Sequence, residues 1–408
     1  MKKFGLLGEK LGHSYSPQIH SMMYENNYDL YEKNAGELDA FFENCPLNGF
    51  NVTIPYKKYV IKYLSKVSDT AKEIGSVNTI IKTQNGFEGY NTDYYGFEYT
   101  VKKLGVKPKD KKVLVLGNGG AAQTVICYFK NENAKDVVVI SRQGENNYGN
   151  INRHFDADII VNCTPVGMYP NNGISPIDLD GFNCLEGVID LIYNPSATEL
   201  ILKAKAKNIP CINGLYMLVA QAKKSAEIFL DKKIDDSEIE RIAKAISNQM
   251  KNIVLIGMPG CGKTTIGKKL ANKLNRSFYD ADEYFEQKHQ ITIPEFFKAY
   301  GEEKFRQAET DVLNELCKKS SCIISTGGGA VTVPLNYNII KQNSTVFLIE
   351  RDLKLLATDG RPLAQANRLE DIYKKRKLLY DRFADFKVTN MSSAELCADE
   401  IIKIMEDF

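Results

Sequence analysis

Short apolar runs rich in β-branched residues recur along the chain and alternate with stretches of helical periodicity. The clearest of these runs are at residues 112–116, 137–140, 159–161, 188–190, 252–256 and 345–349. Strands that are apolar throughout are buried on both faces, which is typical of parallel sheets joined by crossover helices. The pattern therefore predicts an α/β fold, with a first strand near the N-terminus.

Two of the runs end in glycine-rich turns that open helices, one beginning at Gly117 and the other at Gly257. They predict three α/β units: residues 1–100 without a nucleotide turn, 101–234 with a Rossmann-like turn, and 251–408 with a phosphate-binding loop.

Residues 235–250 are predicted to form a helix with one apolar face, which consists of Ile239, Ile242, Ala243 and Ile246. We assign this helix to the unit formed by residues 1–100, so that residues 1–250 make up the first domain. Strand residues begin again at Asn252, and no flexible linker is expected between the two domains.

Composition agrees with two or three ordinary globular domains. The 408 residues are 43% hydrophobic and 25% charged, with a formal net charge of +2. This charge balance does not indicate a nucleic-acid or membrane surface, and no apolar run approaches the roughly 20 residues of a spanning helix. Glu9 and Lys10 interrupt the N-terminal apolar patch before a signal sequence could form.

Nine cysteines and four histidines are scattered singly, without a C-x-x-C pair. A disulfide framework and a structural zinc site are therefore not expected. Free thiols of this kind fit a cytoplasmic protein.

The second glycine turn is a complete phosphate-binding loop, G-x-x-x-x-G-K-T, at residues 257–264. Backbone N–H groups of such a loop converge on phosphate oxygens, while Lys263 neutralises the β- and γ-phosphates and the Thr264 hydroxyl would hold Mg²⁺. The alternative is a glycine turn without a nucleotide, but the strand before and the helix after the turn favour nucleotide binding.

The residues after the loop indicate which class of phosphate-loop protein this part of the chain resembles. Asp280 and Asp282 stand two apart at a predicted strand end, where they would point the same way if the strand continued. Further motifs are a helix opening at 301–309, a glycine run at 327–329, Arg361 in a polar loop, and Arg376 on a helix. In this order, residues 251–408 resemble the shikimate kinase family, which implies a P-loop parallel-sheet domain like that of nucleoside monophosphate kinases.

This resemblance implies roles for individual residues. Asp280 would act in the Mg²⁺ shell together with Thr264, and Asp282 would hold the shikimate hydroxyls and assist the attacking oxygen. The ATP-binding residues would be Gly257, Gly260, Gly262, Lys263, Thr264, Thr265 and Arg361. The shikimate-binding residues would be Asp282, Arg306, Gly328, Gly329 and Arg376, with the two arginines gripping the carboxylate.

Lys263, Asp282 and Arg361 would be catalytic, since positive charge stabilises the transferring phosphoryl group. One departure from the family pattern is that Ala357, Thr358 and Asp359 replace the basic or glycine-rich stretch expected in the lid. We expect this departure to affect the dynamics of the lid and the affinity for ATP, but not the reaction.

The first glycine turn has Gly117, Gly119, Gly120 and Ala121, and it departs from the usual G-x-G-x-x-G spacing. Alone it also fits glycines that only cap a helix. More specific motifs surround it, at residues 12–17, 51–57, 75–79, 89–93, 162–168, 190–195 and 213–221. Their order resembles the shikimate dehydrogenases over residues 1–250.

By this resemblance Lys57 and Asp93 are the catalytic pair, which supplies and recovers the proton that ketone reduction needs. A plain surface lysine is the alternative for Lys57. The substrate-binding residues would be Ser14, Ser16, Thr53, Asn78, Asp93, Tyr193 and Gln221. The NADP-binding residues would be Gly117, Gly119, Gly120, Ala121, Arg142, Thr164, Gly214 and Met217.

Arg142 follows the run at 137–140, where a guanidinium favours the 2′-phosphate of NADP. The second arginine of the family's NADP patch is missing here, and NAD stays open as an alternative.

Together the two resemblances imply a bifunctional enzyme that uses NADP(H), ATP and Mg²⁺. One half would reduce 3-dehydroshikimate to shikimate, and the other would phosphorylate shikimate at its 3-hydroxyl. A regulatory pseudoenzyme is the alternative from another class, and it predicts losses among Lys57, Asp93, Lys263 and Asp280, all of which are present. Activity on quinate stays open, and the sequence predicts no oligomeric state.

Overall fold

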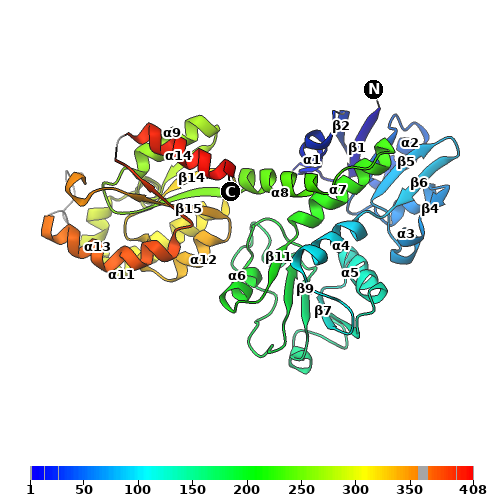
Figure 1. Ribbon diagram of the computed structural model, residues 1–408, viewed down its shortest axis with the longest axis horizontal. Coiled ribbons are helices and arrows are strands. Elements are labelled where there is room, and N and C mark those ends of the chain that lie inside the picture. The colour runs from blue at the N-terminus through cyan, green and yellow to red at the C-terminus, as the bar shows by residue number, and fades with distance from the viewer. Residues whose placement is uncertain (1, 13, 26, 357–365, 392, 408) are drawn as a thin grey trace. The chain divides into compact units, whose positions relative to one another are not determined.

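The protein is described by a computed structural model that covers residues 2–12, 14–25, 27–356, 366–391 and 393–407, without the side chains of 366–368. The chain forms two compact units (Figure 1). Unit 1 consists of Met1–Val166, Ser175–Tyr193 and Lys203–Ile246, and unit 2 consists of Gly167–Ile174, Asn194–Leu202 and Ser247–Phe408.

The first sheet of unit 1 is mixed and has the strand order β2-β1-β3-β5-β6-β4. Its strands are β1 (Lys3–Gly8), β2 (Asn27–Glu32), β3 (Gly49–Val52), β4 (Lys66–Val67), β5 (Thr79–Thr83) and β6 (Gly86–Tyr90). β1 pairs in parallel with β2 and β3, whereas β5 is antiparallel to β3 and β6. The helices of this part are α1 (Ser16–Met23), α2 (Leu38–Glu43) and α3 (Asp69–Ile74), with short 3₁₀ helices at Ala35–Glu37 and Tyr59–Tyr63.

The second sheet of unit 1 is parallel throughout, with the strand order β11-β10-β9-β7-β8. Its strands are β7 (Lys112–Leu116), β8 (Asp136–Ile140), β9 (Ile159–Asn162), β10 (Gly187–Asp190) and β11 (Cys211–Asn213). The helices along this part of the chain are α4 (Asp93–Leu104), α5 (Gly120–Asn131), α6 (Glu199–Ala206), α7 (Leu215–Leu230) and α8 (Ser237–Met250), with a 3₁₀ turn at Ile151–His154. The chain leaves β7 to β8 on one side and returns to β9 on the other, and such a switch point opens a crevice at the carboxyl ends of the strands.

Unit 2 contains a five-stranded parallel sheet of order β13-β14-β12-β15-β16. The strands are β12 (Asn252–Ile256), β13 (Ser277–Asp280), β14 (Cys322–Ser325), β15 (Ser344–Glu350) and β16 (Phe386–Thr389). The helices are α9 (Lys263–Leu274), α10 (Ala281–His289), α11 (Ile293–Lys318), α12 (Leu335–Lys341), α13 (Ala366–Phe383) and α14 (Ala394–Asp407), with 3₁₀ turns at Ala330–Thr332 and Leu353–Leu355. Figure 1 shows α9 and α14 on one face of this sheet and α11, α12 and α13 on the other.

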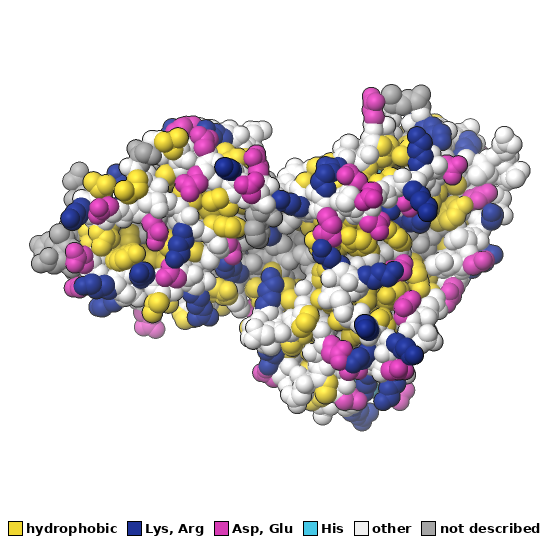
Figure 2. Space-filling view, viewed as in Figure 1, with side chains coloured by type: hydrophobic (Ala, Val, Ile, Leu, Met, Phe, Trp, Pro, Cys, Tyr) yellow, Lys and Arg dark blue, Asp and Glu magenta, His cyan; other side chains and the backbone are white. Residues whose placement is uncertain are grey.

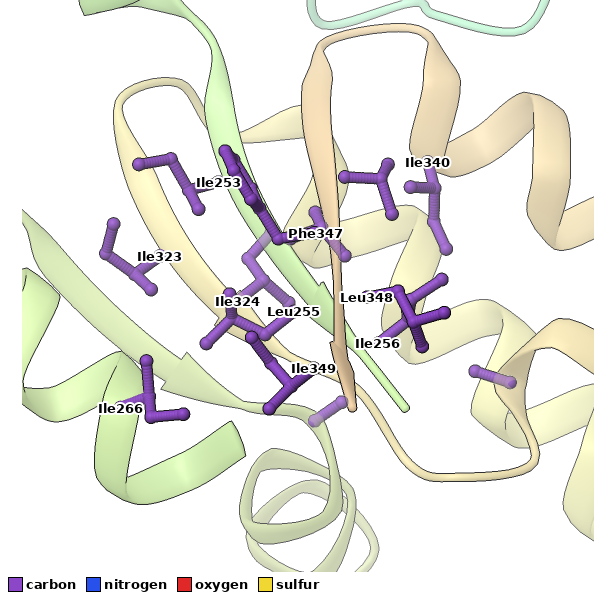
Figure 3. Packing of buried hydrophobic residues seen from close by; sticks show 14 of the residues in the cluster. Ile253, Leu255, Ile256, Ile266, Ile323, Ile324, Ile340, Phe347, Leu348 and Ile349 are labelled. Atoms are coloured by element: carbon purple, nitrogen blue, oxygen red, sulfur yellow. The ribbon is translucent and has the colours of Figure 1, made fainter. Parts of the chain in front are cut away.

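The core of unit 2 explains why its central strands are apolar at nearly every position. Leu255 of β12, Ile324 of β14 and Phe347 of β15 are completely buried, and Ile266 and Ile340 pack against the strands from α9 and α12 (Figure 3). Because helices cover both faces, nearly every position of β12, β14 and β15 is buried, and these strands lose the alternation of apolar and polar residues. The strand predictions at 252–256 and 345–349 are confirmed.

Helix α8 confirms the predicted amphipathic helix at 235–250. Its four predicted apolar positions are at most 2% exposed. The helix ends at Met250, and β12 begins two residues later at Asn252. α11 contains a break at Gly301, where φ is 81°, so a helical segment opens after Gly301 as predicted.

One local prediction is corrected, at the end of β13. β13 ends at Asp280, whose Oδ1 accepts the backbone N–H of Asp282 at 3.0 Å and so caps α10. Asp282 consequently lies on a helix, because the short polar side chain of Asp280 stops the strand.

Charges of both signs are interspersed over the face shown in Figure 2. This mixture agrees with the small net charge. Among the described residues, no helix is both long enough and apolar enough to span a membrane.

Candidate active sites

A cavity of about 540 Å³ lies in unit 1. Residues from both sheets and from the helices between them line it. The predicted dehydrogenase residues that line it are Ser14, Ser16, Thr53, Lys57, Asn78, Asp93, Tyr193 and Gln221. The predicted catalytic pair and every predicted substrate residue of this half therefore share one cavity.

The central feature of this cavity is an ion pair between Lys57 and Asp93. Nζ of Lys57 lies 2.6 Å from Oδ2 of Asp93, and both side chains are partly buried. Asp93 is the first residue of α4, where the positive end of the helix dipole favours a carboxylate. The carboxylate orients an ammonium group that can donate a proton into the cavity and take it back.

The cofactor turn lies next to this cavity. Gly117 has a φ of 96°, and a Cβ there would lie 2.9 Å from Cγ2 of Thr164, so glycine is required. Cβ atoms at Gly119 and Gly120 would meet nothing within 4 Å, and α5 begins at Gly120. The open backbone and the helix N-terminus together fit a pyrophosphate.

The predicted cofactor residues divide into two groups. Ala121, Gly214 and Met217 line the cavity, so the cofactor turn reaches the substrate site. Gly117, Gly119, Gly120, Arg142 and Thr164 are not among the lining residues. Arg142 is exposed two residues beyond the end of β8, where the adenosine ribose of a bound dinucleotide would lie.

Several lining residues were not predicted. Lys10, Leu191 and Leu218 line the cavity, as does the buried amide of Asn51. Asn51 stands in the same N-V-T-I-P motif as Thr53, so the motif could have indicated this residue from the sequence.

A second cavity, of about 480 Å³, lies in unit 2. It contains most of the residues predicted for the kinase half. Those that line it are Lys263, Thr264, Asp280, Asp282, Arg306, Gly328, Gly329 and Arg376. Arg361 and the substituted lid residues 357–359 fall outside the described residues.

The phosphate-binding loop has the geometry that its glycines predict. Gly257, Gly260 and Gly262 have φ values of 144°, 81° and 104°, which side chains rarely adopt. Lys263 is buried, and its Nζ donates to the carbonyl oxygens of Gly257 at 3.0 Å and Met258 at 3.1 Å. The ammonium is thus held against the loop where phosphates would bind.

The two predicted Mg²⁺ residues are adjacent. Oγ1 of Thr264 donates to Oδ2 of Asp280 at 2.6 Å. No cluster of three or more His, Cys, Asp or Glu side chains able to hold a metal occurs in the described part of the chain. A hydroxyl and one carboxylate nevertheless fit Mg²⁺, which keeps several waters and binds through substrate phosphates.

Arg306 and Arg376 supply positive charge to the opposite part of this cavity. Nη1 of Arg306 donates to Oε2 of Glu309 at 2.7 Å, while the buried Nε of Arg306 has no hydrogen-bond partner. Burial raises the pKa of the Glu309 carboxyl, and the charge of Arg306 opposes this rise. Arg306 lines the cavity, and its planar guanidinium fits an oxyanion ligand there.

Gly328 and Gly329 of the glycine run lie against Pro259 and Arg306. A Cβ at Gly329 would lie 2.4 Å from the guanidinium nitrogens of Arg306, and one at Gly328 would lie 2.7 Å from Cδ of Pro259. Only a backbone without side chains fits between the phosphate loop and the arginine. The Gly328 carbonyl accepts bonds from Nη1 of Arg376 at 3.1 Å and from the Tyr380 hydroxyl at 2.6 Å.

Glu309, Tyr380 and Asn390 were not predicted. Glu309 holds Arg306, and Nδ2 of Asn390 donates to the carbonyl of Cys261 in the phosphate loop at 2.8 Å. Glu309 follows Arg306 by three residues on α11, a spacing that places both on one helix face and was the available signal. Asn390 contacts the loop from 129 residues away, and no local pattern indicates it.

Comparisons with known families divide the chain in the same order as the motifs. The sequence model of the shikimate dehydrogenase substrate binding domain matches residues 6–80, and that of shikimate kinase matches residues 259–406. The shikimate dehydrogenase (NADP(+)) of Clostridium beijerinckii is 37% identical over 270 residues, covering 62% of this chain and 100% of that protein. A Clostridium perfringens shikimate dehydrogenase (NADP(+)) is also 37% identical, covering 59% and 97%.

Solved structures of shikimate dehydrogenases are also similar to the first part of the chain. A chorismate mutase/shikimate 5-dehydrogenase fusion protein from Clostridium acetobutylicum is 38% identical with a TM-score of 0.58, covering 60% of this chain and 97% of that one. Shikimate 5-dehydrogenase from Thermus thermophilus, in complex with NADP(H) and shikimate, is 28% identical with a TM-score of 0.55, covering 60% and 99%.

Proposed function

Because the chain belongs to the shikimate dehydrogenase family and carries a shikimate kinase domain after it, we propose that it performs two reactions of the shikimate pathway. Residues 1–250 reduce 3-dehydroshikimate to shikimate with NADPH, and residues 251–408 phosphorylate shikimate with ATP and Mg²⁺. The observation that carries the proposal is that two separate cavities each gather the catalytic and binding groups of one reaction.

The proposed domains follow from this division. Residues 1–100 and 235–250 form the substrate-binding subdomain of the dehydrogenase, and residues 101–234 form its cofactor subdomain. Both reactions use small molecules, and the nine cysteines, all free thiols, support a cytoplasmic site of action.

In the first reaction the nicotinamide cofactor supplies the hydride. Lys57 donates a proton to the carbonyl oxygen as it becomes a hydroxyl, and recovers it in the reverse direction. Asp93 holds the ammonium in place from 2.6 Å. Ser14, Ser16, Thr53, Asn78 and Gln221 bind the carboxylate and hydroxyls of the substrate, with Tyr193 assisting them.

In the second reaction Arg306 and Arg376 hold the shikimate carboxylate. Asp282 holds the hydroxyls and assists the attacking oxygen, while Lys263 neutralises the charge on the phosphates. Thr264 and Asp280 are the residues that would hold Mg²⁺, which would neutralise negative charge on the phosphates. Arg361, by the family resemblance, adds positive charge near the transferring group.

Two assays on the purified full-length chain test the proposal. The first measures NADP⁺ reduction with shikimate, and the second measures shikimate-dependent ADP release. Absence of both activities in folded protein would refute it, and loss of one would restrict it to the other half. Comparing kcat/KM for shikimate and quinate with NADP⁺ and NAD⁺ identifies the preferred substrate and cofactor.

A further inference from the structure

A group of buried hydroxyl and amide side chains lies behind the cavity of unit 1. Its members are Asn51 of β3, Asn78 and Thr79 at the start of β5, Thr92 directly before α4, and Ser225 of α7. Asn51 and Asn78 also line the cavity, whereas the three hydroxyl groups do not. The group therefore connects the interior of the unit to the wall of the substrate site.

Ser225 is the centre of this group. Its Oγ lies 2.7 Å from Nδ2 of Asn51, 2.8 Å from Oγ1 of Thr79 and 3.1 Å from Oγ1 of Thr92. It also lies 3.0 Å from the carbonyl oxygen of Gln221, one turn earlier on α7. A hydroxyl has one donor and two acceptor positions, so these neighbours occupy its whole capacity.

The hydrogen bonds fix the orientation of both amides. Oδ1 of Asn78 lies 2.7 Å from the backbone N–H of Thr92, and an N–H can only donate, so the amide oxygen points inward. The NH₂ group of Asn78 is left for a ligand. Asn51 is fixed in the same way, because its Nδ2 lies 3.2 Å from the carbonyl oxygen of Asn78 and its Oδ1 accepts from Tyr28 at 2.7 Å.

Ser225 also joins the elements that carry the binding groups. Thr92 directly precedes Asp93, and Gln221 lies on the same helix as Ser225. The Ser225 hydroxyl therefore links the helix of Gln221 to the strand of Asn51 and to the start of α4. Burial in a medium of low polarity makes such a network rigid when every member is bonded.

We propose that Ser225 is a positioning residue of the dehydrogenase reaction, which sets the orientation of the Asn51 and Asn78 amides relative to Gln221. This inference rests on the dehydrogenase function proposed above. Ser225 does not line the cavity, so it acts on the substrate only through these neighbours.

The test compares Ser225→Ala with Thr100→Val in the full-length chain. Thr100 is also completely buried, but its Oγ1 bonds only to the Gly96 carbonyl within α4. For Ser225→Ala we expect kcat/KM for shikimate to fall by about ten-fold, chiefly through KM, with KM for NADP⁺ and the pH profile unchanged. Thr100→Val should lower thermal stability without changing these constants.

The unfolding transition of unit 1, identified by its shift with NADP⁺, reports whether each variant is folded. Ser225→Cys keeps the size but weakens the hydrogen bonds, so an intermediate KM is expected, and this variant decides the matter if Ser225→Ala does not fold. If the wild type is active and both Ser225 variants match it in kcat/KM, the inference is overturned. A wild type without dehydrogenase activity overturns the proposed function and this inference with it.

Discussion

The ammonium of Lys57 and the carboxylate of Asp93 lie 2.6 Å apart although 36 residues separate them in the chain. The backbone carbonyl of Lys57 accepts the N–H of Val77 at 2.8 Å, and the Asn78 side chain accepts the N–H of Thr92 at 2.7 Å. One short segment, 77–78, thus holds the turn that carries the lysine and the helix start that carries the aspartate. The pair is preorganised by backbone contacts.

Replacing Lys57 by Met removes the proposed proton donor while keeping a long side chain. We expect kcat of shikimate oxidation to fall by about 10²- to 10⁴-fold, the usual contribution of a positioned acid or base. Asp93→Asn should also lower kcat, because a neutral amide orients the ammonium less strongly. Steady-state rates with NADP⁺ measure both effects.

Lys58→Met is the matched control for this prediction, since Lys58 is the exposed neighbour of Lys57. It should keep the dehydrogenase rate, and all three variants should keep kinase activity. An Lys57→Met chain with wild-type kcat would show that the proton comes from another group.

Arg306→Lys keeps the charge of the kinase cavity but removes the planar guanidinium. Nη1 of Arg306 is already bonded to Glu309, and a lysine cannot hold Glu309 and a carboxylate in the same planar fashion. We expect KM for shikimate in the kinase reaction to rise by about 10- to 100-fold, with KM for ATP nearly unchanged. Arg382→Lys, an exposed arginine on α13, should change neither constant.

The sequence predicted the parallel sheets because strands buried on both faces leave a continuous apolar run, as β12 and β15 do. Local patterns were less reliable at element ends. Asp280 and Asp282 would share one side of the sheet if the strand continued, but the Asp280 side chain accepts the backbone N–H of Asp282 and starts a helix. The periodicity of apolar residues does not predict where a side-chain hydrogen bond to the backbone ends a strand.

The candidate sites were predicted where residues stand in short motifs, as for Lys57, Lys263 and Arg306. Supporting residues were missed because their partners are distant in sequence. Asn51 and Ser225 bond across 174 residues, and Asn390 reaches the phosphate loop across 129. Only the folded chain shows that these side chains hold the motif residues in place.

Arg142→Gln tests the cofactor preference. A charge-assisted hydrogen bond to the 2′-phosphate is worth about 1.5–3 kcal/mol, so kcat/KM with NADP⁺ should fall by about 10- to 100-fold while that with NAD⁺ stays nearly constant. Arg153→Gln, also exposed in this unit, is the control and should change neither value. Equal losses with both cofactors would place Arg142 away from the 2′-phosphate.

His20 is a buried, uncharged histidine in unit 1. It is 1% exposed, its Nδ1 lies 3.0 Å from the Tyr24 hydroxyl, and its ring stacks on Tyr28. Burial lowers its pKa to about 3, and a hydrogen bond with Asn51 partly opposes this shift. In the unfolded chain its pKa would return to about 6.5.

Between pH 6.5 and pH 3 the unfolded chain therefore binds one more proton at this position than the folded chain does. The contribution of His20 to stability is complete above pH 6.5 and is lost as the pH falls, by up to about 1.4 kcal/mol per pH unit. His20→Gln removes the titration, so the free energy of unfolding of unit 1 should depend less on pH between 6.5 and 5.

Urea unfolding followed by circular dichroism, with the unit 1 transition identified by its shift with NADP⁺, measures this dependence. His289→Gln in unit 2 should leave the slope of unit 1 unchanged, and an unchanged slope in His20→Gln would mean that His20 can take up a proton in the folded chain.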